Sequence, residues 1–134
     1  MNAEEYKQLT HNIIGCAIEV HRILGPGLLE SVYRKCLKWE LESKGYHVRE
    51  EVPVPVVYKG HPIDTGYRMD LLVEDVVIVE CKCVDAVHPI HTAQLRSHIV
   101  LANRRVGLVI NFRELLLTDG IKRVVNEFPD TPAT

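Results

Sequence analysis

Three ionisable side chains lie inside two otherwise apolar stretches of this 134-residue chain: Asp70 in residues 67–73, and Glu80 and Lys82 in residues 77–84. Buried strands seldom carry charges unless those charges have partners or a chemical role. Two carboxylates can hold a hard divalent cation such as magnesium, and an ammonium group beside them can orient or deprotonate a water molecule. These residue types are sufficient for a minimal centre that cleaves phosphodiester bonds.

The spacing of the three residues decides whether they can meet. Alternate side chains of a β-strand share a face, so Glu80 and Lys82 point to one side and Cys81 to the other. An antiparallel hairpin with a three-residue loop at 74–76 places Asp70 directly opposite Glu80. A loop of residues 74 and 75 alone shifts the register by one and moves Asp70 to the opposite face. A metal site therefore requires an odd-length loop or a bulge at this turn.

The remaining chain supplies the elements that hold these residues. Apolar residues at steps of three or four predict helices, and alternating or unbroken apolar runs predict strands. Pro53 and Pro55 lack donors on one side of their strand, which places that strand at a sheet edge. In chain order we expect helices at residues 4–24 and 28–44, the edge strand at 48–58, two central strands, a helix at 90–102, and strands at 106–112 and 121–125. This order predicts an α/β protein with a mixed α+β sheet and helices on its faces.

The composition is that of one globular domain. Hydrophobic residues make up 46% of the chain and charged residues 25%, and the length is enough to bury a core without disulfides. We expect a single domain at residues 1–128 and a flexible C-terminal tail at residues 129–134. The formal net charge of −2 argues against the broad cationic surface of non-specific nucleic-acid binders. Any contact with nucleic acid must therefore be local or assisted by a metal ion.

The chain start and the cysteines indicate the compartment. The sequence shows neither a secretory signal pattern nor an apolar run near the roughly 20 residues that span a bilayer. We therefore expect a cytoplasmic protein that has no membrane partner. The four cysteines fall in apolar patterns and are expected to be reduced core thiols: Cys16, Cys36, Cys81 and Cys83. Cys81 and Cys83 share a face, but no second pair has the spacing of structural zinc or iron–sulfur sites.

The central residues resemble a known pattern. Asp70, followed ten residues later by Glu80-Cys81-Lys82, is similar to the paired-acid and lysine signature of the PD-(D/E)XK nuclease superfamily. Residues 27–33, which read Gly-Leu-Leu-Glu-Ser-Val-Tyr, resemble the motif of the GxxExxY protein family, a branch of that superfamily. The segments at 52–55, 67–73, 93–95 and 106–112 resemble the same family in the same order. The resemblance covers about residues 5–125.

The resemblance implies a restriction-endonuclease-like core and a metal-dependent nuclease. The core would contain helices, a three-strand meander, a further helix and a strand. Asp70 and Glu80 would bind Mg²⁺ or Mn²⁺ together with the backbone carbonyl of Cys81. Lys82 would orient the attacking water or stabilise the charge of the developing phosphorane.

The resemblance also assigns roles on two helices. Glu30 corresponds to an acid that contacts the metal ion, directly or through water, and Gln94 corresponds to a polar residue that lines the site. Two positions depart from the pattern. Cys81 stands where family members commonly carry leucine or another apolar residue, which changes little if only its carbonyl binds metal. His98 stands where related nucleases can place a tyrosine, and this leaves the role of its helix open.

Each candidate residue also has a purely structural explanation. Asp70, Glu80 and Lys82 could close the hairpin as an ion pair, although desolvation offsets much of such a pair's attraction. Glu30 could serve only the dipole of its helix. Arg68 shares the face of Asp70 in a regular strand, where it could bind a substrate phosphate or pair with a carboxylate.

Histidines and aromatic residues supply the remaining candidates. His91 could contact a phosphate or carry a proton. Zinc binding by His88 and His91 is a weaker alternative, because no cysteine or acid at matching spacing accompanies them. Tyr33 and Trp39 are expected to be core aromatics rather than platforms for stacked bases.

Two functions are consistent with these residues. The first is a metal-dependent nuclease that hydrolyses phosphodiester bonds of DNA or RNA. The alternative is a non-catalytic nucleic-acid or protein-binding module of nuclease fold within a larger repair or defence assembly. A purely structural domain is a third and weaker interpretation. Nucleic acid is the expected partner, and a homodimer is compatible with the resemblance because related nucleases often dimerise to cut both strands.

Overall fold

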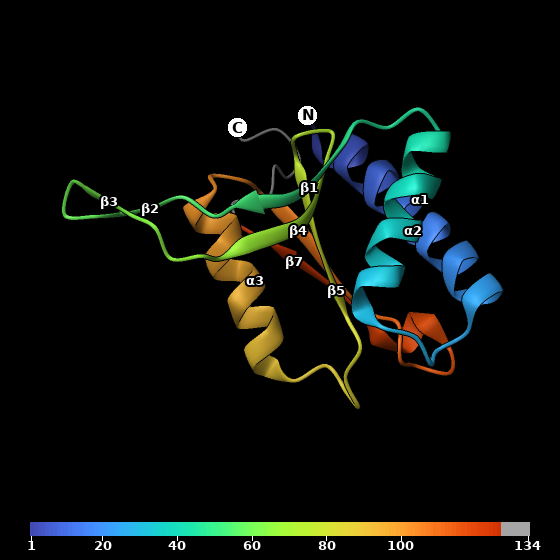
Figure 1. Ribbon diagram of the computed structural model, residues 1–134. Coiled ribbons are helices and arrows are strands. Elements are labelled where there is room, and N and C mark those ends of the chain that lie inside the picture. The colour runs from blue at the N-terminus through green and yellow to red at the C-terminus, as the bar shows by residue number, and fades with distance from the viewer. Residues whose placement is uncertain (127–134) are drawn as a thin grey trace.

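A computed structural model of the protein describes residues 1–126, which form a mixed sheet with helices on both faces (Figure 1). In chain order the elements are α1 (Ala3–Leu24), α2 (Glu30–Ser43), β1 (Val48–Pro53), β2 (Val56–Tyr58), β3 (His61–Ile63), β4 (Arg68–Val73), β5 (Val77–Lys82), α3 (Pro89–Leu101), β6 (Val106–Asn111), the 3₁₀ turn η1 (Leu117–Gly120) and β7 (Ile121–Val125). The predicted elements and their order are confirmed, apart from the single strand at 48–58. The predicted domain end at residue 128 and the tail at 129–134 lie outside the described residues.

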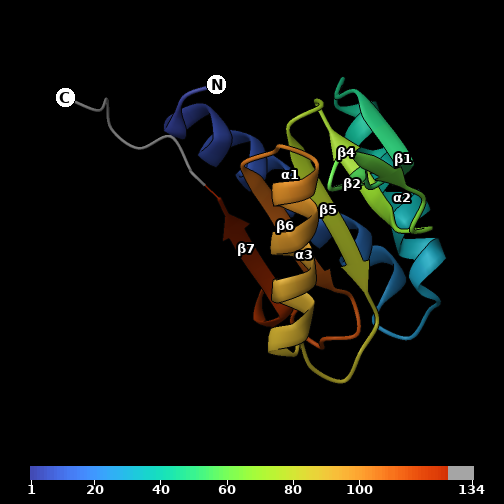
Figure 2. The same cartoon turned by 90° about the vertical axis from the view of Figure 1, so that its left-hand side faces the viewer.

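The five-stranded sheet has the order β1-β4-β5-β6-β7. β1, β4 and β5 form the predicted antiparallel meander, β5 and β6 pair in parallel, and β7 pairs antiparallel with β6. β1 lies at an edge, as Pro53 and Pro55 predict for this part of the chain. Helix α3 connects the two parallel strands and covers one face of the sheet, while α1 and α2 cover the other (Figure 2).

Helix α1 begins at a capping box. Asn2 Oδ1 accepts from the Glu5 backbone N–H at 2.8 Å, and Glu5 Oε1 accepts from the Asn2 N–H at 3.0 Å. Helix α2 begins at Glu30, two residues later than the apolar pattern predicts. The Tyr33 hydroxyl accepts from the Leu28 N–H and donates to the Gly25 carbonyl, so it holds the residues before Glu30 outside the helix.

The predicted strand at residues 48–58 is two separate strands, so this prediction was wrong. β1 ends at Pro53, and β2 pairs only with β3, with Val56 opposite Ile63 and Tyr58 opposite His61. The turn between β2 and β3 contains two residues with positive φ, 48° and 81°. Apolar residues continue at even positions across the break although no residue of β2 is buried, so the pattern cannot show that the pairing partner changes.

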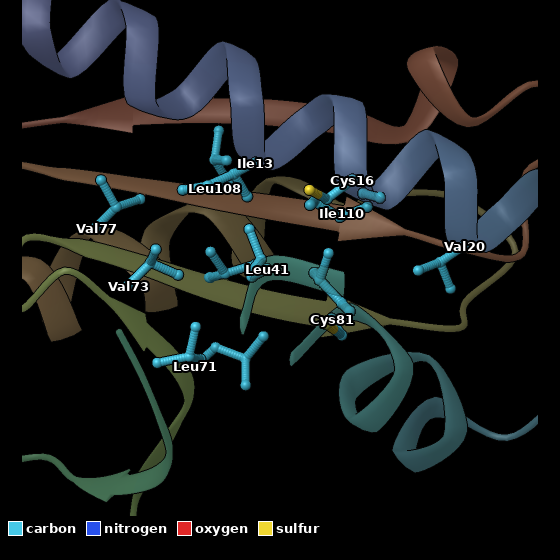
Figure 3. Packing of buried hydrophobic residues seen from close by; sticks show 14 of the residues in the cluster. Ile13, Cys16, Val20, Leu41, Leu71, Val73, Val77, Cys81, Leu108 and Ile110 are labelled. Atoms are coloured by element: carbon cyan, nitrogen blue, oxygen red, sulfur yellow. The ribbon is translucent and has the colours of Figure 1, made fainter. Parts of the chain in front are cut away.

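The sheet separates two apolar clusters. On the side of α1 and α2, Ile13 and Cys16 point toward Leu108 and Ile110 of β6 (Figure 3). On the side of α3, the cluster consists of ten residues with Val87 packed against them: Val52, Val54, Met69, Leu72, Ile78, Leu95, Ile99, Ala102, Val109 and Val124. Odd positions of β5 belong to the first cluster and Ile78 to the second, so Glu80 and Lys82 are on the α3 side.

Trp39 is not a core residue, contrary to the prediction. Its side chain is 67% exposed, whereas Tyr33 is fully buried and stacks on Phe112 with the ring centroids 4.6 Å apart. The buried stripe of α2 consists of Tyr33, Leu37 and Leu41, at steps of four. Trp39 lies two positions after Leu37 and therefore falls on the other side of the helix. No helix within residues 1–126 has the length and apolar content needed to cross a bilayer.

Candidate active site

The hairpin between β4 and β5 has the loop that the metal hypothesis requires. Val73 pairs with Val77 and Leu71 with Val79, so residues 74–76 form a three-residue connection. The first two loop residues have φ of 54° and 59°, and the Val76 N–H donates to the Val73 carbonyl at 3.0 Å. Extended by one residue beyond its last pair, this register aligns Asp70 with Glu80, and the Asp70 charge acts on the Glu80 carboxyl. The predicted odd-length loop is confirmed.

Asp70 lies where the two strands stop pairing. The antiparallel ladder ends at Leu71 and Val79, and the Asp70 carboxylate Oδ2 accepts from the Cys81 backbone N–H at 2.8 Å. In a strand, the N–H and C=O of one residue point to the same edge. The Cys81 carbonyl therefore also faces the side of Asp70, while its thiol is buried in the opposite cluster.

Glu80 is the most deeply buried acid of this group, with 7% of its surface exposed. Burial raises the pKa of Glu80 to about 7; the Asp70 charge also raises it, while His98 and Lys82 act in the opposite direction. Its Oε1 lies 3.5 Å from Nδ1 of His98, too far for a well-formed hydrogen bond. Within residues 1–126 neither atom has a hydrogen-bond partner. A buried carboxylate oxygen without a partner is a position that a cation or a water molecule would satisfy.

His98 connects Glu80 to the surface. Its ring also contacts Tyr67, with centroids 5.8 Å apart and the planes tilted by 40°. The sequence identified His98 only as a departure from the family pattern. Its spacing from Gln94 and His91, four and seven residues, places all three on one face of α3 and was the available signal.

Lys82 lies half-buried at the end of β5. The pKa of His91 is lowered, mainly by burial and secondly by the Lys82 charge. The Lys82 charge also lowers the pKa of Glu30, against the larger upward effect of burial. The ammonium is therefore an electrostatic neighbour of both residues. After Lys82, the buried Asn111 side chain holds the chain by exchanging hydrogen bonds of 3.1 and 2.9 Å with the Val84 backbone. This contact steadies the strand end that carries the lysine.

Glu30 occupies the first turn of α2 and is half-buried. Burial raises the pKa of its carboxyl, and the nearby Asp70 charge raises it further. Four residues later, Arg34 Nε donates to Glu50 Oε2 at 2.7 Å and Nη2 lies 3.3 Å from Glu51 Oε1. The sequence reasoning missed Arg34, although its i,i+4 spacing from Glu30 was a signal. Its contacts join α2, which carries Glu30, to β1.

His88 and His91 form the cap of α3. Nδ1 of His88 accepts from the Ile90 N–H at 3.1 Å, and Nδ1 of His91 accepts from the His88 N–H at 3.0 Å. In the neutral rings the proton must then be on Nε2, which leaves each ring one donor. One nitrogen of each ring is committed to the helix start, which weakens the zinc alternative.

Gln94 and Arg68 lie at the margin of the site. Gln94 is exposed on α3, one turn before His98. Arg68 is exposed, and its Nη1 donates to the Tyr67 carbonyl at 3.0 Å instead of pairing with Asp70 or Glu30. The structure therefore does not show the predicted contacts of these two side chains.

Metal coordination by side chains alone does not fit this site. In the described part of the chain, no three His, Cys, Asp or Glu side chains are arranged to hold an ion. Two carboxylates from Asp70 and Glu80 and the Cys81 carbonyl are a set of hard oxygen donors. Mg²⁺ is commonly bound by one or two carboxylates, with water and substrate phosphate in its other positions. The unpartnered Glu80 Oε1 and this donor set therefore fit magnesium or manganese.

A cavity of about 630 Å³ lies elsewhere, between α1 and α2. Its lining includes His11, Cys16, Glu40 and Tyr46 and none of the residues that the sequence predicted for the site. Asp70 and Lys82 are both partly exposed, so the candidate site does not depend on an enclosed pocket.

The family comparison covers most of the chain. The family model described as the PD-(D/E)XK nuclease superfamily matches residues 7–124. No curated protein and no solved structure matches the chain. The matched range contains every candidate residue named above, from Glu30 to His98.

Proposed function

Since the chain belongs to the PD-(D/E)XK nuclease superfamily, we propose that it is a metal-dependent nuclease that hydrolyses phosphodiester bonds of DNA or RNA. Its five-stranded mixed sheet with three helices is consistent with the restriction-endonuclease-like fold of that superfamily. Nucleases of this superfamily generally use divalent metal ions and act on nucleic acid. Assignment to the GxxExxY branch rests on the sequence resemblance of residues 27–33.

One observation carries the proposal. Asp70 and Glu80 each follow directly after the last β4–β5 pair, and the Asp70 charge acts on Glu80. Asp70 accepts from the Cys81 N–H, while the buried Glu80 Oε1 has no hydrogen bond within residues 1–126 and lies 3.5 Å from His98 Nδ1. An ion pair that only closed a hairpin would leave no such oxygen, because unpaired buried acceptors are costly. The arrangement is explained if an ion or its bound water belongs between the carboxylates.

The residues then have distinct roles. Asp70, Glu80 and the Cys81 carbonyl would hold Mg²⁺ or Mn²⁺, and Glu30 would contact it through water. When bound, the ion would polarise a phosphoryl oxygen and stabilise its developing charge. Lys82 would orient the attacking water and stabilise negative charge on the phosphoryl group.

Three further residues would contact substrate. His91 would donate from Nε2 to a phosphate oxygen, since its Nδ1 is used in the helix cap. Arg68 would bind a neighbouring phosphate after leaving the Tyr67 carbonyl, and Gln94 would line the approach along α3. Each of these roles is a proposal for an exposed or half-buried side chain.

A non-catalytic binding module is the second candidate. The formal net charge of −2 favours it, because a nuclease that works alone on long nucleic acid commonly has a cationic surface. In that case the protein would act inside a larger repair or defence assembly that supplies the affinity. A homodimer and a cytoplasmic location remain predictions from the sequence.

A cleavage assay tests the first candidate. Labelled single- and double-stranded DNA and RNA are incubated with the protein and Mg²⁺ or Mn²⁺, beside Glu80→Gln and Lys82→Ala variants. We expect metal-dependent cleavage by the wild type and its loss in both variants. Cleavage that persists in both variants would indicate a contaminating enzyme and remove the nuclease proposal. Metal binding without cleavage of any substrate would favour the binding module.

A further inference from the structure

The β2–β3 hairpin projects from the body of the protein. In the described part of the chain its two strands pair only with each other, in a sheet separate from the five-stranded one. Figures 1 and 2 show that it extends away from the edge of the main sheet, on the side that α3 covers. The hairpin leads directly into Tyr67 and Arg68 at the start of β4, and therefore into the strand that carries Asp70.

The hairpin and its base present exposed aromatic rings. Tyr58 is 62% exposed and Tyr67 is 59% exposed, and Val57 beside them is exposed as well. Large apolar surfaces are usually covered unless they serve recognition. An exposed tyrosine has a flat face on which an unpaired base can stack.

The same segment is locally cationic. Residues 56–68 contain Lys59 and Arg68 and a single acid, Asp64, which gives a net charge of +1 in a chain whose net charge is −2. Lys59 Nζ lies 5.4 Å from the centroid of the Tyr58 ring, and Arg68 Nη1 lies at the Tyr67 carbonyl. Each tyrosine thus has one cation near it. Binding of a single strand needs this combination, because the bases stack on aromatic rings while cations attract the phosphate backbone.

These rings are continuous with the candidate active site. The Tyr67 ring contacts His98, and His98 Nδ1 lies 3.5 Å from Glu80 Oε1. A base stacked on Tyr67 would therefore place its own phosphate next to the carboxylate pair. Within residues 1–126 the exposed Trp39 has no such connection to Glu80; it lies beside Ile23 and Leu24 in the α1–α2 layer.

We infer that the β2–β3 hairpin and Tyr67 form a binding arm for single-stranded nucleic acid, which stacks its bases on Tyr58 and Tyr67 and leads its backbone to Glu80. This inference rests on the proposed function, because it names the substrate form of that same site. A paired duplex conceals the base faces that tyrosines need, and a local charge of +1 is too small to hold a duplex by its phosphates alone. Stacking therefore selects unpaired strands.

Fluorescence anisotropy tests the arm without cleavage. The probes are fluorescein-labelled oligothymidylate and oligouridylate of about 20 nucleotides and a blunt DNA duplex of the same length. All proteins carry Glu80→Gln, and the buffer contains EDTA. Replacing both Tyr58 and Tyr67 with Ala should weaken single-strand binding at least about tenfold, whereas replacing both with Phe should leave it within about twofold. Trp39→Ala is the matched control for an exposed aromatic residue and should bind normally.

Three outcomes would overturn the arm: no binding of either single strand, equal binding by the double-Ala variant and the parent, or duplex binding as tight as single-strand binding. Thermal melts of the two double variants separate lost stacking from lost folding, and the Phe pair decides the matter if the Ala pair is unstable. Failure of the proposed function is visible separately. If the wild type binds single strands through its tyrosines but never cleaves them, the binding arm is supported and the nuclease proposal is refuted.

Discussion

Asp70 and Cys81 are joined by a hydrogen bond in which a carboxylate replaces a backbone carbonyl of the strand ladder, with Oδ2 2.8 Å from the Cys81 nitrogen. The contact occurs where β4 and β5 stop pairing, and it fixes one candidate ligand against the backbone of the other strand. A charged residue thereby becomes part of the hydrogen bonding of the sheet. The site and the fold are coupled at this point, and the coupling can be measured.

Asp70→Asn and Asp70→Ala should differ in stability although both remove the charge. The amide oxygen of Asn can still accept from the Cys81 N–H, whereas Ala leaves that buried donor unpaired. We expect Asp70→Ala to lower the free energy of unfolding by about 1–3 kcal/mol relative to Asp70→Asn. Urea denaturation of the metal-free proteins measures the difference. Equal stabilities would mean that the hydrogen bond contributes nothing to the fold.

Glu80 should make the metal-free protein less stable as the pH rises. The pKa of Glu80 is about 7 in the folded protein and near 4.5 in an unfolded chain. Between these values the folded state keeps a proton that the unfolded state has lost, so stability falls with increasing pH, by up to an amount on the order of 3 kcal/mol. Glu80→Gln should remove this fall between pH 5 and 7, as followed by thermal melts. A fall of the same size in the variant would assign it to other groups.

Magnesium or manganese should stabilise the folded protein. An ion that binds only the folded state adds about 2.7 kcal/mol when its concentration is 100 times its dissociation constant. The melting temperature should therefore rise with either ion in the wild type and stay constant in Asp70→Asn and Glu80→Gln. Glu42→Gln is the control, because Glu42 pairs with Lys38 on the surface of α2 and should leave the rise intact. A rise that survives in Glu80→Gln would locate the ion elsewhere.

Arg34 and Glu50 should show a measurable coupling energy. The hydrogen bond from Arg34 lowers the pKa of Glu50, and both side chains are mostly covered. We expect a double-mutant cycle with Arg34→Met and Glu50→Gln to give about 1 kcal/mol at pH 7. The exposed Arg22–Glu19 pair, treated in the same way, should give a smaller coupling energy, because solvent screens it. A smaller coupling for the first pair than for the second would contradict the anchoring role of Arg34.

Two Gly→Ala changes should have opposite signs. At Gly107 of β6, a Cβ would lie 2.8 Å from Leu95 Cδ1 and 3.1 Å from the Ile78 carbonyl, so Ala should destabilise the protein by about 1–3 kcal/mol. At Gly15, inside α1, nothing lies within 4 Å of the added carbon, and Ala should stabilise by about 0.5–1 kcal/mol. Chemical denaturation measures both. A neutral Gly107→Ala variant would mean that α3 does not pack closely on β6.

Local patterns in the sequence were sufficient for most of the elements. The capping pair Asn2–Glu5 marked the start of α1, and Pro53 and Pro55 placed the first strand at an edge. Prediction from the sequence failed where the extent or the buried side of an element depends on what the element packs against. The alternation through residues 48–58 is the same for one strand or two. Trp39 was wrongly predicted to be a core residue, because its side of α2 depends on which stripe of the helix is buried.

The sequence by itself determined which residue types could perform chemistry and that Glu80 and Lys82 share a face, because strand periodicity is a property of the backbone alone. Only the tertiary structure decided that the Asp70 charge acts on Glu80, that His98 lies against Glu80, and that Arg34 ties α2 to β1. These relationships join residues 10–18 positions apart along the chain. They depend on the loop register and on helix packing, and the energies that select them come from burial across the whole core.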